Sequence, residues 1–323
     1  MSLADVLRRR AREHPERTAY IFLHDGEVEA DRRTYAGLDA RAHAIAARLQ
    51  SRGAEPGDRA LLLFPPGLDF IDAFFGCLYA GVIAVPCYPP RPGRGQPRLK
   101  AILSDAGARF ALCTAAIAGK LETLAADDAE IAGLARIATE ECASTSLPLR
   151  TGDDGIAFLQ YTSGSTATPK GVMVTHANLA FMEGLIAEVF EQGEESVVVA
   201  WLPVYHDMGL IGNVLQPLWL GATCVLMAPV AFLRRPRRWL EAISRYRATT
   251  SGGPSFAYEL CAERIAPEDR RGLDLSSWRV AFNGAEPVRA AALESFATAF
   301  APSGFRREAL QPCYGLAEAT LLV

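Results

Sequence analysis

The sequence predicts an α/β protein built on mostly parallel sheets, and three observations favour this class. The chain has 323 residues, of which 50% are apolar and 22% charged, a composition typical of a folded globular protein. Short apolar runs alternate with longer stretches of helical periodicity. Two segments share one scheme, in which a helix is followed by glycine, an apolar run and proline. At about 150 residues per domain, the length predicts two compact units or one large unit with subdomains.

The elements follow in chain order. The first is an amphipathic helix within residues 1–20, rich in arginine and glutamate and without the apolar core of a signal peptide. A helix over residues 68–80 ends at Gly81. Segments without apolar periodicity, at residues 88–97, 144–155 and 191–196, are expected to be loops. The buried strands are predicted at residues 59–64, 82–85, 109–113, 156–161, 197–201, 223–228 and 278–282.

Residues 208–233 carry no charged side chain, and the segment is longer than the roughly 20 residues that span a bilayer. Glycine and proline interrupt it, however, and Gly221 stands where a helix would stop before the strand-like run at residues 223–228. We therefore expect a buried helix followed by a buried strand, and no membrane span.

Charge and cysteine content exclude several classes of function. The 33 basic and 37 acidic residues give a formal net charge of -4, which does not favour nucleic acid as a partner. The seven cysteines are scattered, odd in number and never form a C-x-x-C pair. This pattern argues against a disulfide framework and a structural zinc site, and it predicts a reducing compartment, the cytoplasm.

The strongest local motif is the segment YTSGSTATPKG at residues 161–171, which follows a predicted strand. Hydroxyl and backbone N–H donors can surround phosphate oxygens, glycine permits close approach, and Lys170 supplies a positive charge. The segment is not a Walker A loop, because Pro169 follows Gly164 by five residues and Gly171 stands where serine or threonine is required. On composition alone, a polar turn between strands remains an alternative.

Three further motifs follow predicted strands. The segment WLPVYHDMGLIG at residues 201–212 places His206 beside Asp207 at the start of a helix, although a lone histidine is more often structural. The other two are NGAEPV at residues 283–288 and QPCYGLAEAT at residues 311–320. An aromatic face such as Tyr314 suits a purine, and a carboxylate such as Glu318 suits a hard cation. Taken alone, these two side chains also fit core packing and a charge at a helix N-terminus.

Together these motifs resemble those of the adenylate-forming enzymes, which include acyl-CoA synthetases, luciferases and nonribosomal adenylation domains. YTSGST-x-x-PKG resembles their phosphate loop, with Ala167 where glycine is usual. LPxYHDMGLIG and YGLAEATL resemble the fatty acyl-AMP ligase subfamily, in which Ala317 replaces the threonine of most members. The resemblance covers essentially the whole chain. It implies the large N-terminal domain of such an enzyme, with two interleaved α/β subdomains in a layered αβαβα arrangement.

The resemblance places the first subdomain, with the phosphate loop, at residues 58–192. The second subdomain, with the acyl and adenine motifs, comprises residues 1–57 and 193–323. A complete family member continues with a ribose-binding aspartate, a hinge and a small C-terminal domain that carries a catalytic lysine. We therefore expect this chain to lack the C-terminal domain and to turn over poorly by itself.

The function implied is ATP-dependent activation of a medium- or long-chain fatty acid to an acyl-adenylate, with release of pyrophosphate. The acyl group then passes to the phosphopantetheine thiol of an acyl carrier protein. ATP and Mg²⁺ are the implied cofactors. The implied catalytic residues are His206, Lys170 and Glu318, the last also holding the metal. The implied nucleotide contacts are Thr162, Ser163, Gly164, Ser165, Thr166, Lys170, Asn283, Gly284, Ala285, Glu286, Tyr314, Gly315 and Ala317. The implied acyl contacts are His206, Met208, Gly209, Ser251, Ser255 and Phe256.

Several alternatives accompany this hypothesis. A fatty acyl-CoA synthetase would use coenzyme A as the acceptor, and a non-catalytic module would only bind nucleotide or acyl groups. A hydrolase with Ser255 as its nucleophile is disfavoured, because no histidine follows His206. The arginine-rich residues 234–238 fit either a docking surface for an acidic carrier protein or the solvated first turn of a helix.

Overall fold

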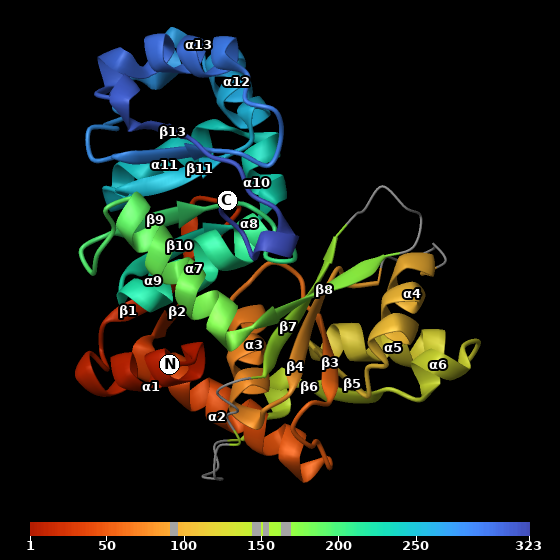
Figure 1. The fold of residues 1–323 in the computed structure, drawn as a ribbon. Coiled ribbons are helices and arrows are strands. Elements are labelled where there is room, and N and C mark those ends of the chain that lie inside the picture. Colours follow the sequence, from red (N-terminus) through yellow and green to blue (C-terminus); the bar gives the residue numbers. More distant parts are fainter. Residues whose placement is uncertain (91–95, 144–149, 151–154, 163–168) are drawn as a thin grey trace. The chain divides into compact units, whose positions relative to one another are not determined.

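The structure is a computed structural model that describes residues 1–90, 96–143, 150, 155–162 and 169–323. The chain divides into two compact units (Figure 1). Unit one comprises Met1–Arg17 and Arg33–Phe181, and unit two comprises Thr18–Arg32 and Met182–Val323. Each unit contains a sheet and helices, which confirms the predicted α/β class.

Unit one is built on a six-stranded sheet of order β6-β5-β3-β4-β7-β8, in which only the β7–β8 pair is antiparallel. Its strands are β3 (Arg59–Leu63), β4 (Ile83–Cys87), β5 (Phe110–Cys113), β6 (Ala135–Ala138), β7 (Ile156–Thr162) and β8 (Lys170–Thr175). Its helical segments are α1 (Leu3–Glu13), α2 (Tyr35–Ser51), α3 (Asp69–Ala80), α4 (Pro97–Ala106), α5 (Ala115–Ala125), α6 (Ala129–Ala132) and η1 (Thr139–Glu141). Helix α7 (His176–Val189) begins in unit one and ends in unit two.

The two faces of this sheet are covered by different helices. Because strand side chains alternate between faces, Leu61 and Leu63 both join the apolar cluster formed with α4, α5 and α6. Helix α3 packs on the other face, where the Phe74 ring meets Phe158 of β7 edge to face at 5.7 Å. Burial on both faces therefore explains why these continuous apolar runs form central strands.

The predicted division of the chain differs from the observed one at its N-terminal part. Residues 1–17 and 33–57 belong to unit one rather than to the unit of residues 193–323, and residues 182–192 belong to unit two. One reason is a buried ion pair: the fully buried Asp72 carboxylate lies 3.1 Å from Arg33 and 3.4 Å from Arg41. Helix α2 also packs closely on α3, since a Cβ at Gly76 would lie 2.5 Å from Ile45.

Unit two is built on a seven-stranded sheet of order β13-β12-β11-β9-β10-β1-β2, parallel from β13 to β1. Its strands are β1 (Thr18–His24), β2 (Val28–Thr34), β9 (Val197–Ala200), β10 (Thr223–Met227), β11 (Thr250–Gly253), β12 (Val280–Asn283) and β13 (Leu310–Pro312). Its helical segments are α8 (Asp207–Leu210), the π-helix η2 (Ile211–Leu215), α9 (Gln216–Leu220), α10 (Pro229–Arg234), α11 (Arg237–Tyr246), α12 (Ser255–Arg264), η3 (Pro267–Arg270), α13 (Ala290–Phe300), η4 (Ala301–Ser303), η5 (Arg307–Ala309) and η6 (Ala317–Ala319).

Connections from two neighbouring strands of this sheet run to opposite faces. Helices α11, α12 and α13 share one apolar core with one face of the strands, and Trp239 and Trp278 lie at its centre. Segment η2, which follows β9, lies on the other face, where Tyr20 Oη donates to Val214 O at 2.6 Å. The segment that follows β9 and the segment that follows β11 therefore diverge at the carboxyl ends of these strands.

The predicted buried helix and buried strand are confirmed over residues 208–227, whereas residues 229–233 belong to α10, where Val230 and Leu233 are exposed. The helical part forms α8, η2 and α9, and Gly221, with a φ of 80°, ends α9 before β10 begins. The described residues contain no helix with the length and apolar character needed to cross a membrane.

Candidate functional site

The candidate site of unit two lies at the carboxyl ends of β9, β11, β12 and β13. In open parallel sheets, ligands bind where neighbouring connections diverge to opposite faces, as they do after β9 and β11. His206 follows β9, residues 284–288 follow β12, and Tyr314 follows β13. The topology therefore brings three of the predicted motifs to one edge of the sheet.

His206 occupies the N-cap position of α8. Its Nδ1 lies 2.5 Å from Asp207 Oδ1, which also accepts from the Met208 N–H at 2.7 Å. The hydrogen bond to Asp207 is the main reason why the pKa of His206 is raised. His206 Nδ1 thus faces Asp207 and also lies 3.4 Å from the Met208 backbone nitrogen, and the side chain is 58% exposed.

Two glycines allow the motifs to approach one another. A Cβ at Gly209 would lie 2.1 Å from the Pro203 carbonyl oxygen, so only glycine fits there. A Cβ at Gly284 would lie 2.9 Å from Cys313 Sγ and 3.1 Å from Met208 Cε. Met208, Gly284 and Cys313 thus meet, and each belongs to a different motif.

The loop after β12 is braced by its own side chains. Asn283 is buried, donates from Nδ2 to Gly253 O at 3.0 Å and accepts from Ser255 Oγ at 3.2 Å. Glu286 Oε1 accepts from the Phe256 N–H at 2.9 Å, in the first turn of α12. Ala285 is exposed, with a strained φ of 67°. The backbone and Ala285, rather than the Asn283 and Glu286 side chains, remain available to a ligand.

The last motif presents an exposed aromatic ring. Tyr314 is 67% exposed, which rules out the core-packing alternative for its side chain. A Cβ at Gly315 would lie 2.0 Å from Leu321 O, and the Leu316 N–H donates to the same oxygen at 2.9 Å. Ala317 is buried and Glu318 exposed, both in η6. Within the described ranges, no three His, Cys, Asp or Glu side chains cluster as a metal site.

Two of the predicted acyl contacts belong to the framework of unit two. Ser251 is fully buried; its Oγ donates to Val199 O at 2.6 Å and accepts from Trp239 Nε1 at 2.7 Å, so it faces the aromatic core. The fully buried Ser255 accepts from the Arg289 N–H at 3.1 Å while it donates to Asn283. Both hydroxyls are occupied. Among the other predicted acyl contacts, Phe256 is half-buried, and the Met208 side chain lies against Gly284.

The phosphate-loop motif lies in unit one, between β7 and β8. Thr162 and Lys170 are paired across these antiparallel strands, so the motif joins two strands rather than a strand and a helix. Ser163, Gly164, Ser165 and Thr166 lie outside the described residues. At the ends of the motif, Tyr161 Oη donates to Asp105 at 2.5 Å, and a Cβ at Gly171 would lie 2.9 Å from the Tyr161 ring. The Lys170 side chain is exposed.

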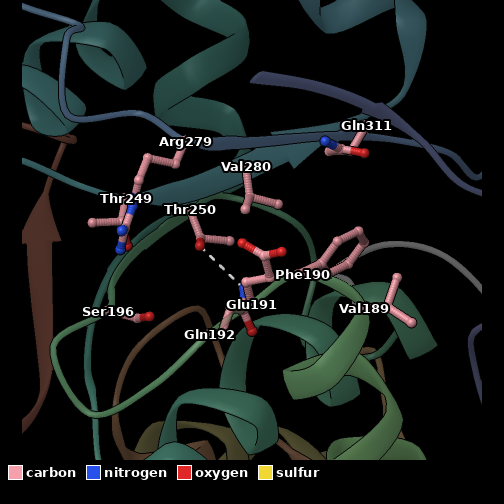
Figure 2. A pocket seen from close by; sticks show the side chains of 10 residues that line it. All are labelled: Val189, Phe190, Glu191, Gln192, Ser196, Thr249, Thr250, Arg279, Val280 and Gln311. Atoms are coloured by element: carbon pink, nitrogen blue, oxygen red, sulfur yellow. Dashed lines mark hydrogen bonds between the residues drawn. The ribbon is translucent and has the colours of Figure 1, made fainter. Parts of the chain in front are cut away.

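A separate cavity of about 220 Å³ lies at the amino ends of β11 and β12, the edge opposite to His206 and Tyr314. Figure 2 shows side chains from the end of α7 and from the starts of both strands around it. No sequence motif indicated this cavity. Its lining residues are Val189, Phe190, Glu191, Gln192, Ser196, Thr249, Thr250, Arg279, Val280 and Gln311.

A series of hydrogen-bonded polar side chains runs from this cavity into the interior of unit two. Gln192 Nε2 donates to Thr250 Oγ1 at 3.1 Å, and the Gln216 amide lies 3.1 Å from Gln192 Oε1. The Gln216 amide also contacts the carboxyl group of Glu183, which is fully buried. Burial raises the pKa of Glu183 well above its usual value. With the Gln216 amide oriented to satisfy its neighbours, its nitrogen donates to the carboxyl group and to the backbone oxygen of Glu183.

We expect Glu183→Gln to lessen the loss of stability at high pH. When the pKa of a carboxyl group is higher in the folded than in the unfolded state, the free energy of unfolding falls as pH rises above the unfolded-state pKa. The fall is up to about 1.4 kcal/mol per pH unit. Glutamine cannot ionise, and its side-chain oxygen can still accept from the Gln216 amide. Urea unfolding at pH 5, 6.5 and 8 measures the difference, with the exposed Glu188→Gln as the matched control. Parallel pH profiles for wild type and Glu183→Gln would contradict the assignment.

Comparison with known proteins shows the family to which the chain is similar. The AMP-binding enzyme family matches residues 7–323. A medium-chain-fatty-acid–[acyl-carrier-protein] ligase of Moorena producens is 47% identical over 331 residues, covering 100% of this chain and 56% of that protein. A long-chain-fatty-acid–AMP ligase of Mycobacterium tuberculosis is 39% identical, covering 100% and 57%.

A solved structure is similar over the same span. The fatty acyl-adenylate ligase from L. pneumophila, in complex with acyl adenylate and pyrophosphate, has a TM-score of 0.91 at 47% identity. The match covers 100% of this chain and 56% of that one, so the chain spans a little over half the length of these relatives. Because the family match extends over nearly all of the sequence, the chain belongs to the AMP-binding enzymes.

Proposed function

We propose that the protein to which this chain belongs activates a medium- or long-chain fatty acid with ATP and passes the acyl group to an acyl carrier protein. The observation that carries the proposal is the meeting of Met208, Gly284 and Cys313, beside the exposed Tyr314 and His206. The names of the similar ligases support the choice of a fatty acid and of a carrier protein as acceptor. The seven cysteines are all free, which fits a reducing compartment such as the cytoplasm.

The first step joins two anions. A carboxylate oxygen of the fatty acid bonds to the α-phosphorus, and the bond from that phosphorus to the pyrophosphate oxygen breaks. Repulsion between the anions must be offset, and the exposed Lys170 supplies a compact positive charge for phosphate oxygens. In the second step the thiol of the carrier loses its proton, its sulfur bonds to the acyl carbon, and AMP leaves.

Glu318 is the residue that would hold Mg²⁺. It is a single exposed carboxylate, and Mg²⁺ in nucleotide sites takes one or two carboxylates together with phosphate oxygens. A bound Mg²⁺ would supply positive charge for the phosphates. The exposed Tyr314 ring would stack on the adenine, beside the backbone of residues 284–286.

His206 would orient the carboxylate of the fatty acid. Since Asp207 raises the pKa of His206, the protonated ring is favoured, and its Nε2–H can donate to an anionic oxygen. Met208, which is mostly buried and touches Gly284, would contact the acyl group next to that carboxylate.

The test is the exchange of labelled pyrophosphate into ATP by the full-length protein, with fatty acids of increasing chain length. We expect exchange that depends on the acid, and a thioester with holo carrier protein in preference to coenzyme A. Lys170→Ala and Glu318→Ala should each lower exchange at least tenfold, while Lys120→Ala, at another exposed lysine, should not. No exchange with any acid would favour the non-catalytic module, and thioester formation only with coenzyme A would favour an acyl-CoA synthetase.

A further inference from the structure

A second concave surface of unit two is lined by arginines from separate elements. A cavity of about 230 Å³ lies among the end of α10, the start of α11, the end of α12 and η3. Its charged lining consists of Arg234, Arg235, Arg237, Arg264 and Asp269. Because Arg264 lies 27 residues beyond Arg237, folding rather than sequence proximity gathers these guanidinium groups.

The positive charge of this surface is only partly neutralised. Arg235 and Arg238 share the Glu27 carboxylate at 3.0 and 2.8 Å, and Arg237 pairs with Glu241 at 3.0 Å. Within the described part of the chain, the exposed Arg234 and Arg264 have no ion pair closer than 4 Å. The cavity therefore has unpaired positive charge on a chain whose net charge is -4.

One hydrogen-bond donor at this surface also lacks an acceptor. Arg237 Nε is buried and has no partner among the described atoms. An unpaired buried donor of this kind is costly unless an acceptor is supplied. The unpaired guanidinium groups of Arg234 and Arg264 favour an anionic ligand, whereas the buried Arg237 Nε shows only that Arg237 is incompletely paired.

Apolar side chains adjoin the arginines. Helix α10 exposes 48% of Val230 and 46% of Leu233, immediately before Arg234. Arginine is enriched at protein–protein interfaces, whose fully buried centre is more apolar than the rest of the surface. A site for a free inorganic anion would gain nothing from the aliphatic groups. The composition therefore favours a protein over a small anion.

We propose that this arginine surface docks a protein partner that presents carboxylates beside apolar side chains. The surface is formed by Val230, Leu233, Arg234, Arg235, Arg237 and Arg264. Complementary charge speeds the encounter and fixes orientation, and the aliphatic residues of α10 supply contact area. The proposal concerns a surface outside the nucleotide motifs and does not depend on the chemistry proposed above.

The test uses this chain and a labelled helical peptide with glutamates on one face and leucines on the other. Fluorescence anisotropy, in the absence of nucleotide, should show saturable binding that weakens as salt is raised. Arg234→Glu/Arg264→Glu should weaken binding at least tenfold, and Leu233→Ala severalfold. Arg52→Glu/Arg306→Glu, the same charge change at two other exposed arginines, should leave it unchanged. A peptide with lysines in place of the glutamates should not bind.

Three results would overturn the proposal. The first is no saturable binding by the wild-type chain, and the second is equal loss in both double variants. The third is full competition by millimolar inorganic phosphate with no effect of Leu233→Ala, which would identify a small-anion site. Arg234→Gln/Arg264→Gln serves as a milder second pair, and circular dichroism confirms that each variant is folded.

Discussion

Gly209→Ala will destabilise unit two by about 3 kcal/mol or more, because the added methyl group has no space. Its Cβ would lie 2.1 Å from Pro203 O and 2.7 Å from Pro203 C. The carbonyl cannot easily retreat, since it accepts from the His206 N–H at 3.1 Å. Overpacking against side chains alone costs about 1–3 kcal/mol, and here the obstacle is backbone. All four tryptophans fall within unit two, so urea unfolding followed by tryptophan fluorescence reports on this unit.

Gly184→Ala is the matched control for this prediction. Gly184 lies in α7, and a Cβ there would meet no atom within 4 Å. Alanine in a helix is favoured over glycine by about 1 kcal/mol, so the control should be unchanged or more stable. If Gly209→Ala unfolds at the same urea concentration as Gly184→Ala, the close approach at Pro203 is wrong. Gly209→Ala should also weaken binding of a non-hydrolysable acyl-adenylate mimic, because residue 209 adjoins His206 and Met208.

Asn283→Asp will cost about 2–4 kcal/mol at pH 8 and clearly less at pH 5. The wild-type Nδ2 donates to Gly253 O at 3.0 Å, and aspartate would place a carboxylate oxygen against that carbonyl. Residue 283 is fully buried, so ionisation there is penalised by desolvation as well as by repulsion. The folded-state pKa of the new carboxyl group should therefore exceed its unfolded value of about 3.9. Stability is consequently lost as pH rises, and the protonated form can still donate to Gly253 O.

Asn283→Ala separates the effect of charge from the effect of the missing hydrogen bonds. It removes the bonds to Gly253 and Ser255 without adding an ionisable group, so its loss of stability relative to wild type should not change with pH. Urea unfolding at pH 5 and pH 8 measures both variants. If Asn283→Asp shows the same deficit at the two pH values, then the carboxyl group is not confined against Gly253 O.

Much of the fold follows from local patterns. The apolar runs at residues 59–64, 109–113, 156–161 and 197–201 correspond to β3, β5, β7 and β9, because strands buried on both faces are continuously apolar. Gly81 and Gly221 end helices with φ of 70° and 80°, a conformation that glycine adopts at little cost. The three motifs that follow β9, β12 and β13 lie at one edge of the sheet of unit two, since parallel strands share a carboxyl edge. The nucleotide contacts predicted at residues 163–166 lie outside the described residues, and the division into subdomains, predicted from the family resemblance, differs from the observed one.

The direction of individual side chains required the tertiary structure. Ser251 and Ser255 have the polarity of ligand contacts, yet their hydroxyls hold β11 and α12 in place. The carboxyl group of Glu183 is indistinguishable in sequence from that of the exposed Glu188. No local pattern indicates whether a serine or a glutamate faces a core, a neighbouring loop or solvent, because that depends on elements distant in the chain.

By itself, then, the sequence determined the α/β class, the order of strands and helices, and the motifs that identify an AMP-binding enzyme, because hydrophobic period and glycine position act within a few residues. Only the tertiary structure decided that α2 packs with α3, that Met208, Gly284 and Cys313 touch, and that Arg234 and Arg264 line one cavity. These contacts join residues far apart in the chain, and packing and charge pairing across that separation are settled only when the sheets and helices assemble.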